Sequence, residues 1–507
     1  MENLLNRQGV QVSRCAINGR QECGVSGEYS LPDYCPDIAV ILKCLVTPMI
    51  QNRHWSGEQL LIDGTALFRV LYLDEDRCRI HSVEFSHPFT CSMKTDGFIE
   101  MGMLSLELTV KYVNCRALSS RRLEARCGVC VHAFAECSDS YDVALPPQTE
   151  GLMSRCETVC LSAVVSAAEK ILTVSETFDF PNDLSSAEML LGGECRVDVK
   201  ECKLLKGKAI VKGNVYIHQL YTDDFSKGTT HCLDFTLPYS QILDIDDCAE
   251  VLIANAHAVV LSDTERCIAG PDGENSVLEV TVKLLIQCQI HQNSQVELLT
   301  DAYHTQYPIT VKKQEKSFST YLGCGIHQSI LPMLFDLPNT AIQELLDVWI
   351  TPGESGVNVR DDVGLITGKL MISMIARDRD GQIAYYERTE EFQLEQPCSG
   401  NRVEASITIG EVRYRAIDGK IELQVNLNIA LRAYHDGIYH VIEDMQIHKE
   451  SPYPKQRAGV LMYYAQQGES VWDIGSHCHA DAKNIRLEND LSTDIILRPT
   501  LLAVPLT

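Results

Sequence analysis

Alternating apolar and polar residues run through most of the chain. Segments such as TALFRVLYL, LSLELTVKYV, VLEVTVKLLIQCQI and KIELQVNLNIALRAY combine a period of two with many β-branched and aromatic residues. This combination is typical of strands that pack one face against a core. The pattern therefore predicts a mainly β protein.

One strand-like segment occurs three times. LIDGTALFRVLYLD, IVKGNVYIHQLYTD and LITGKLMISMIARD each hold a glycine, nine further residues and an aspartate. The glycines are Gly64, Gly213 and Gly368, so they lie 149 and 155 residues apart. The apolar positions that agree in register are Ala66, Val215 and Leu370; Phe68, Ile217 and Ile372; and Leu71, Leu220 and Ile375. The aspartates are expected at turns, since Asp hydrogen-bonds nearby backbone there; they are Asp74, Asp223 and Asp378.

The flanks of this segment repeat in the same order. A proline precedes an apolar run 30 to 32 residues before each glycine, at Pro32, Pro181 and Pro338. A phenylalanine segment follows each aspartate, anchored on Phe85, Phe235 and Phe392. We interpret the chain as three divergent copies of one β-rich domain. Short helices are expected in the lead-ins, as in NTAIQELLDVW.

The periodicity becomes helical near the C-terminus. Ser470 followed by Asp473 has the spacing of a capping box, and Asp481 is expected to cap a second short helix that runs to Asn489. The residues expected to face inward are Val471, Ile474, Gly475, Cys478 and Ile485. MYYAQ before these helices and LLAVPL after them predict two strands. The tail is therefore predicted to be a small β-α-α-β domain.

The predicted domain order follows from these segments. A chain of 507 residues is too long for one ordinary core. The predicted divisions are an N-terminal segment at 1–29, repeats at 30–148, 165–313 and 320–449, and the small domain at 460–507. The polar, proline-containing stretch Glu450–Val460 is the expected linker before that domain.

Charge and targeting signals limit the classes of partner. The formal net charge of −25 argues against binding to nucleic acid or to anionic membrane surfaces. The start of the chain lacks the basic and apolar regions of a signal peptide. The most apolar run, IAVILKCLVTPMI, is too short for a membrane span and contains Lys43 and Pro48. A cytoplasmic protein with no integral membrane segment is expected, and its 21 cysteines are expected to be mainly buried free thiols.

No catalytic motif is evident. Phosphate loops, His-Glu-x-x-His and nucleophile elbows are missing from the sequence, so no enzyme activity, cofactor or metal is expected. Cys127 and Cys130, with His132 and Cys137, are the local alternative for zinc, but two cysteines at this spacing in a strand point to opposite faces. The HCH run at 477–479 diverges around a helix. DRDGQ at 378–382 is interpreted as a turn and not as a calcium loop.

The tail resembles the LysM domain between Leu461 and Pro505. The matching positions are Gly468, Ser470, Trp472, Ile474, Ile485, Asn489 and Pro505, and the chain differs at Cys478, His479 and Pro499-Thr500. In the family, the loops after the first strand and after the second helix bind N-acetylglucosamine. The resemblance implies partner- or glycan-binding residues at Gly468, Glu469, Ser470, Trp472, Asn489, Asp490 and Leu491. Trp472 has two interpretations: an exposed interface anchor or a residue packed between the helices.

The three copies resemble the SPOCS domain, a spore-coat-associated domain, in their lead-in, Gly-strand-Asp and Phe segments. Three SPOCS-like repeats followed by one LysM-like domain resemble spore coat morphogenetic proteins. The resemblance implies a non-enzymatic scaffold in the mother-cell cytoplasm, at the forespore surface. Its LysM-like domain would bind a SpoIVA-like coat ATPase, and other coat proteins are further candidate partners. Two alternatives stay open: a peptidoglycan-binding protein of the cortex or cell wall, and an enzyme with its cleft in one copy.

Overall fold

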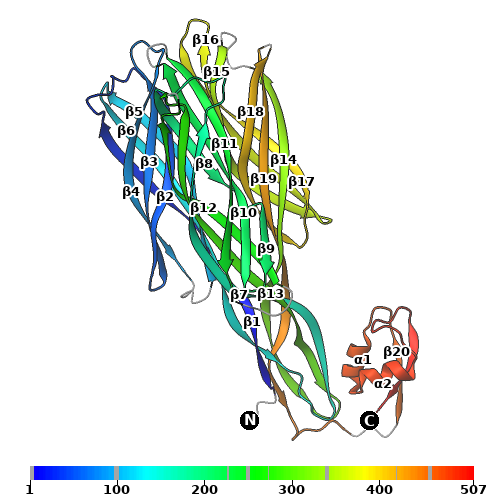
Figure 1. Ribbon diagram of the computed structural model, residues 1–507. Helices are drawn as coiled ribbons and strands as arrows, with labels where there is room; N and C mark the ends of the chain where they lie inside the picture. The colour runs from blue at the N-terminus through cyan, green and yellow to red at the C-terminus, as the bar shows by residue number, and fades with distance from the viewer. Residues whose placement is uncertain are drawn as a thin grey trace.

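The computed structural model describes residues 5–95, 102–224, 228–246, 252–271, 273–336, 342–417, 419–454 and 459–506. Most of these residues form strands, and the two helices within these ranges lie near the C-terminus (Figure 1). The prediction of a mainly β protein is therefore confirmed, and the strands form several separate sheets. No helix in the described ranges has the length and apolar character needed to cross a membrane.

The strands before residue 448 form three units with the same strand order. Unit one contains β1 (Arg7–Ser30), β2 (Val40–Ser56), β3 (Gln59–Leu73), β4 (Ile80–Lys94), β5 (Gly102–Ser119) and β6 (Arg122–Ala144). Unit two contains β7 (Leu152–Asp179), β8 (Met189–Val197), β9 (Glu201–Leu205), β10 (Lys208–Asp224), β11 (Thr229–Asp244), β12 (Leu252–Ile268) and β13 (Val277–His304). Unit three contains β14 (Ile309–Asp336), β15 (Ile342–Arg360), β16 (Val363–Asp378), β17 (Ile383–Pro397), β18 (Arg402–Ile417) and β19 (Lys420–Ile447).

Each unit is built from two antiparallel sheets. The long sheet pairs the first, last and penultimate strands, in the orders β1-β6-β5, β7-β13-β12 and β14-β19-β18. The short sheet is the meander between them: β2-β3-β4, β8-β10-β11 with β9 also on β10, and β15-β16-β17. In unit one, Ala66 and Phe68 of the short sheet share one apolar core with Cys127 and Val129 of the long sheet. The period-two pattern thus buries one face of each sheet against the other.

Gly64, Gly213 and Gly368 lie in the central strands of the three short sheets. They pair across the sheet with Phe89, Tyr239 and Phe392 respectively. Each ring lies over its glycine, because an added Cβ would come within 2.4 to 2.7 Å of the ring or its hydroxyl. The predicted equivalence of Phe392 with Phe85 and Phe235 is wrong, since Phe85 pairs with Phe68 and Phe235 with Ile217. The correct counterparts of Phe392 lie four residues later, and one of them is a tyrosine.

All nine apolar positions that agree in register are buried, with at most 2% of each side chain exposed. The first two sets belong to the three sandwich cores. Leu71, Leu220 and Ile375 point the other way, into a cluster shared by all three units. We call it the central cluster; its buried members are Leu42, Leu71, Leu73, Ile80, Leu191, Leu220, Leu346, Trp349, Ile375 and Ile383. The three short sheets therefore meet one another through their outer faces.

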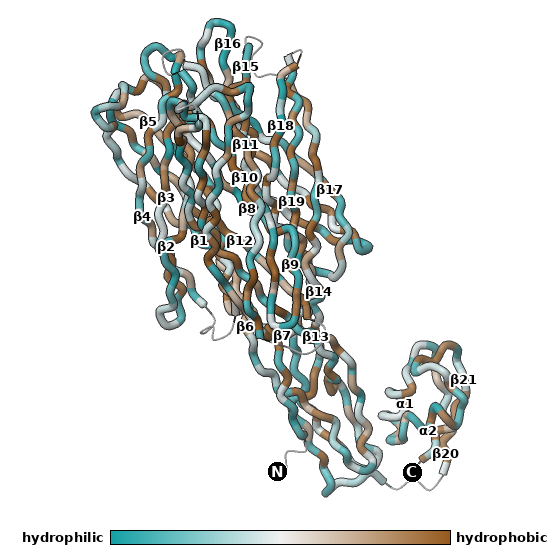
Figure 2. Tube along the Cα trace, viewed as in Figure 1, coloured by the Kyte–Doolittle hydropathy of each residue, from teal (hydrophilic) through white to brown (hydrophobic). Residues whose placement is uncertain are grey.

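The long strands continue beyond the sandwiches as a narrower extension, visible at the lower end of the molecule in Figure 1. Leu161 and Leu298 of unit two pack there with Val143 of unit one and Val441 of unit three. Figure 2 shows apolar residues along the interior of the bundle and hydrophilic residues at its upper loops. The three units are thus joined at two levels, by the central cluster and by this extension.

Two local predictions need correction. The predicted N-terminal segment 1–29 supplies β1, which pairs with β6 along its whole length, so the first sandwich begins before the predicted boundary. The predicted helix in NTAIQELLDVW is wrong from Ile342 onward, where β15 begins, because cross-strand pairing with β16 outweighs local helical preference. Pro338 and the first residues of that segment lie outside the described ranges.

The predicted turn at DRDGQ is confirmed. Asp378 Oδ1 accepts hydrogen bonds from the backbone N–H groups of Asp380 and Gln382, at 2.9 and 2.8 Å. The corresponding aspartates in units one and two are 3.0 and 3.2 Å from His81 and His231 across their hairpins. The third copy therefore uses the aspartate to hold backbone where the other two use it to hold a histidine.

The 20 cysteines that the structure describes are free; Cys248 lies outside those ranges. Cys127 belongs to the core of unit one, whereas Cys130 is buried on the other face of β6. The expectation that these two thiols point to opposite faces is confirmed by this alternation.

Candidate functional site

The C-terminal unit has the predicted β-α-α-β order. It consists of β20 (Val460–Ala465), α1 (Val471–Cys478), α2 (Ala482–Glu488) and β21 (Thr500–Pro505), with β20 and β21 antiparallel. Ser470 accepts a hydrogen bond from the backbone N–H of Asp473 at 3.0 Å, and Asp481 accepts one from Lys483 at 2.7 Å. Both predicted helix caps are confirmed, and all five residues expected to face inward are buried.

The loop before α1 lies beside the loop after α2. The backbone N–H of Gly468 donates to Ile496 O at 2.8 Å, and that of Val471 donates to Asp494 O at 2.7 Å. Gly468 has a φ of +90°, which glycine adopts without strain. Glu469 closes the first loop by accepting from the backbone N–H of Gln466 at 2.8 Å. Asp490 is exposed in the second loop, and Leu491 packs against the core of the unit.

Asn489 fastens α2 to β21. Its side-chain amide donates to Ala503 O and accepts from the backbone N–H of Ala503, both at 2.7 Å. A third bond runs from its Nδ2 to Ile485 O at 2.8 Å. The polar groups of Asn489 and Ser470 thus have partners within the unit, while ligand binding at the loop residues stays a prediction.

Trp472 connects the C-terminal unit to unit two. Its indole N–H donates to Asp301 Oδ2 at 2.8 Å, and its ring packs against that of Tyr303 in a T-shaped arrangement with centroids 4.8 Å apart. Only 9% of Trp472 is exposed. The interpretation as an exposed anchor is therefore wrong, and the indole is packed against another unit as well as its own core. Both of its partners lie on β13, about 170 residues earlier in the chain.

The partners of Trp472 on β13 make polar contacts with the C-terminal unit. Tyr303 Oη donates to Ala480 O at 2.8 Å and accepts from the backbone N–H of Ala482 at 3.2 Å. Asp301 also accepts from Lys313 Nζ at 2.8 Å. Desolvation alone would raise the pKa of Asp301, but the hydrogen bonds from Lys313 and Trp472 outweigh it and lower that pKa. The bond to the indole is therefore charge-assisted.

The outward face of β20 and β21 is apolar and exposed. Tyr464 and Leu501 lie directly opposite each other, with 60% and 56% of their surfaces exposed. Met462, also 56% exposed, and Val460, 50% exposed, continue this face along β20. We call these four residues the outer sheet face. Sequence analysis predicted both strands but missed this exposed face. It could have been recognised because both strands carry apolar residues on both of their faces.

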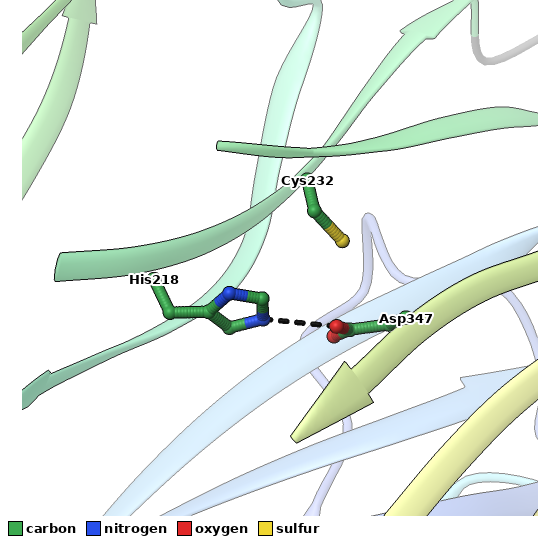
Figure 3. A group of neighbouring side chains, drawn as sticks. All are labelled: His218, Cys232 and Asp347. Carbon is green, nitrogen blue, oxygen red and sulfur yellow. Dashed lines mark hydrogen bonds and ion pairs between the residues drawn. The ribbon is translucent and has the colours of Figure 1, made fainter. Parts of the chain in front are cut away.

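A second group of functional side chains lies between units two and three. His218 is on β10, Cys232 and Asp234 are on β11, and Asp347 is on β15. Figure 3 shows the His218 ring directed at Asp347, with the Cys232 thiol beside them. His218 Nε2 is 2.9 Å from Asp347 Oδ1, and Nδ1 is 2.8 Å from Asp234 Oδ1. No short motif links these residues, so sequence analysis did not find them.

Burial and charge oppose each other in this group. Desolvation lowers the pKa of His218, but the carboxylates of Asp347 and Asp234 outweigh it and raise that pKa to about 10. Burial, followed by the charge of Asp347, raises the pKa of the Cys232 thiol well above its ordinary value. The thiol donates to Leu346 O at 3.1 Å. In the absence of a bound cation, His218 is a charged imidazolium between two carboxylates.

Comparison with known proteins identifies the SPOCS segments. Residues 37–118 and 186–263 match the family model described as SipL, SPOCS domain. The first segment spans β2 to β5 and the second spans β8 to most of β12, so both cover a complete short sheet and part of the strand that follows. No curated protein and no solved structure matches the chain. The family match indicates a sporulation-related protein with protein partners.

Proposed function

Because the chain is a SPOCS-domain protein that resembles SipL, we propose that it is a non-enzymatic spore coat scaffold. Its partner would be a SpoIVA-like coat ATPase, captured by the C-terminal unit, and other coat proteins are further candidates. The site of action would be the mother-cell cytoplasm at the forespore surface. There the scaffold would help to localise coat around the forespore.

This proposal includes the three units as divergent SPOCS-like copies and the C-terminal unit as a LysM-like domain. The shared strand order and the glycine–aromatic pair in each short sheet support the first part. The β-α-α-β order and the two capped helices support the second. Unit three has these features in the same register, and this supports its inclusion as a third copy.

The observation that carries the proposed mode of binding is the outer sheet face. Tyr464 and Leu501 expose contiguous apolar surface that water solvates poorly. Exposed apolar faces of this kind are typical of protein interaction sites. Trp472 contacts Asp301 and Tyr303 of unit two, so its proposed role is to hold the C-terminal unit in place and not to bind the partner.

Substitution of the outer sheet face tests the proposal. We expect the double variant Tyr464→Ala/Leu501→Ala of the full chain to bind the coat ATPase at least about tenfold more weakly, which corresponds to about 1.4 kcal/mol. The matched control is Leu487→Ala, which removes an apolar side chain 77% exposed on α2 of the same unit. Unchanged affinity in the double variant would rule out this face.

A second arm separates the protein partner from the glycan alternative. The wild-type chain and the double variant are incubated with insoluble peptidoglycan and sedimented. The proposal predicts no capture by peptidoglycan under conditions in which the coat ATPase is bound. Capture that depends on Gly468, Glu469 or Asp490 would instead favour the alternative of a peptidoglycan-binding protein.

A further inference from the structure

The three units meet at three joints of similar construction around the central cluster. In each short sheet, the residue five positions after the central glycine faces a cross-strand partner: Arg69 with Glu84, His218 with Asp234, and Ser373 with Glu387. A strand from a neighbouring unit reaches each of these pairs. That strand is β8 at the first pair, β15 at the second and β2 at the third.

Two of these joints pair one cationic side chain with one carboxylate. At the first, Arg69 donates to Glu84 and to Gly193 O of β8, both at 2.6 Å. At the third, Lys43 of β2 donates to Glu387 at 2.7 Å and also contacts Tyr385. One cation thus faces one carboxylate at each of these positions.

The joint between units two and three differs in charge. The residue that enters from β15 is an aspartate, Asp347, although the pair that it meets already contains Asp234. Cys232 adds a thiol whose sulfur, together with the ligand atoms of His218 and Asp347, forms a group within 4.8 Å. Two carboxylates and a thiol around one imidazole are a donor set suited to a cation.

Strand geometry directs Asp347 into this joint. The pairing of β15 with β16 shifts register between Leu345 and Asp347, so Leu346 is the extra residue of a bulge. A bulge re-aims the side chains beside it. Leu346 itself enters the central cluster, and its carbonyl accepts from the Cys232 thiol.

These observations lead to one site. We propose that His218 Nε2, Cys232 Sγ and Asp347 bind a zinc ion that clamps unit two to unit three. Nitrogen, thiolate and carboxylate donors are those that zinc takes in tetrahedral sites, where ligand atoms lie about 3.5 Å apart. Reaching that spacing requires the Cys232 thiol to turn away from Leu346 O, and His218 Nε2 and Asp347 Oδ1, now 2.9 Å apart, to separate slightly.

Asp234 is the hydrogen-bond acceptor that a zinc-binding histidine usually has on its other ring nitrogen. It accepts from His218 Nδ1, which leaves Nε2 as the metal-binding nitrogen. An open cavity of about 450 Å³ lies beside the thiol, and Cys232, Asp234, Arg413 and Tyr414 are among the residues that line it. A water molecule from this cavity would be the fourth ligand of the proposed site. Binding releases one proton from His218 and one from Cys232, so Zn²⁺ replaces two protons and the charge of the joint is conserved.

Metal content of the purified full-length chain tests this site. After loading with zinc and dialysis against metal-free buffer, we expect about one zinc ion per wild-type chain and little in Cys232→Ser or His218→Gln. Replacement of zinc by Co²⁺ should give a near-ultraviolet thiolate-to-cobalt charge-transfer band. That band should disappear in Cys232→Ser.

Two variants separate the site from other thiols and from joint stability. Cys195→Ser removes a thiol that lies near Asp263 and Glu265, and it should keep both the zinc and the cobalt band. Lys43→Met opens the joint between units one and three without removing a ligand, and it should also keep the zinc. The proposal is overturned if the wild-type chain retains no zinc, if Cys232→Ser retains it, or if Cys195→Ser loses it.

Discussion

Gly213 shows how closely backbone and side chains approach in a short sheet. A Cβ at this position would lie 1.9 Å from Asp198 O and 2.6 Å from the Tyr239 hydroxyl. Gly213→Ala must therefore displace backbone, and overpacking of this kind costs about 1–3 kcal/mol. We expect a lower midpoint of chemical unfolding for the variant.

Gly356→Ala is the matched control for this prediction. An added Cβ at Gly356 of β15 would meet no atom within 4 Å, and alanine loses less conformational entropy than glycine in a strand. Its unfolding midpoint should be unchanged or slightly raised. Equal destabilisation by both substitutions would show that flexibility, and not the close approach to Asp198, requires glycine at position 213.

His218 makes stability depend on pH in the metal-free chain. Its pKa is about 10 when folded, above the ordinary value of 6.5, so the folded state holds the proton more tightly than the unfolded state. This contribution is fully present below about pH 6.5 and is lost as the pH rises towards 10. In EDTA, unfolding midpoints should fall over that window, and His218→Gln should flatten the dependence.

Zinc should reverse the direction in which the stability of the folded chain changes with pH. Because binding releases protons from His218 and Cys232, zinc stabilises the folded chain more strongly as pH rises. Unfolding midpoints measured with and without zinc should therefore diverge between pH 6.5 and 9. Identical curves would mean that the joint is held by the imidazolium alone.

At the scale of elements, local signals predicted strands, caps and turns well. Ser470, Asp481 and Asp378 hold the backbone groups expected of them, because each hydrogen bond spans only a few residues. The register of Phe392 was predicted wrongly, because the ring that covers the central glycine is a phenylalanine in two units and a tyrosine in the other. β1 was missed as part of the first sandwich because its partner, β6, lies more than 90 residues away.

In the candidate sites, too, features set by local sequence could be predicted, whereas contacts between distant parts of the chain could not. The loops around Gly468 and Asp490 follow from local sequence, and they lie in one unit as expected. The environment of Trp472 does not, because Asp301 and Tyr303 come from β13. The group around His218 requires three strands from two units, and only the folded chain brings them together.

Tyr303 is predicted to control docking of the C-terminal unit. Tyr303→Phe removes the hydroxyl that bonds Ala480 O and the Ala482 N–H, which leaves two buried backbone groups without this partner. We expect docking to weaken by about 1–3 kcal/mol. Limited proteolysis between residues 448 and 460 should then become faster.

Leu487→Ala serves as the control for this docking measurement, because Leu487 is exposed on α2. Its rate of cleavage in the linker should equal that of the wild type. Unchanged cleavage in Tyr303→Phe would show that the Trp472 contact alone holds the unit.

At the scale of the whole molecule, the joints close a ring. Unit one contacts unit two at Arg69, unit two contacts unit three at His218, and unit three contacts unit one at Lys43. The C-terminal unit lies outside this ring, on β13 of unit two, beside the lower end of the bundle (Figure 1). The contacts that join the three units are therefore separate from the outer sheet face, which stays exposed.

Removal of residues 459–507 tests that separation. The central cluster and the three sandwich cores contain no residue from this segment, so the shortened chain should keep its β-sheet circular dichroism and the cooperative unfolding of the three units. Binding of the coat ATPase should be lost, because Tyr464, Leu501 and Met462 are removed together.

The shortened chain also exposes Tyr303 and Met153, which pack against the C-terminal unit in the full chain. Tyr303→Ser in the same background limits aggregation through this patch and serves as a control for non-specific capture. If the shortened chain binds the ATPase at full strength with and without that substitution, the interface lies on the ring. The outer sheet face would then need another ligand.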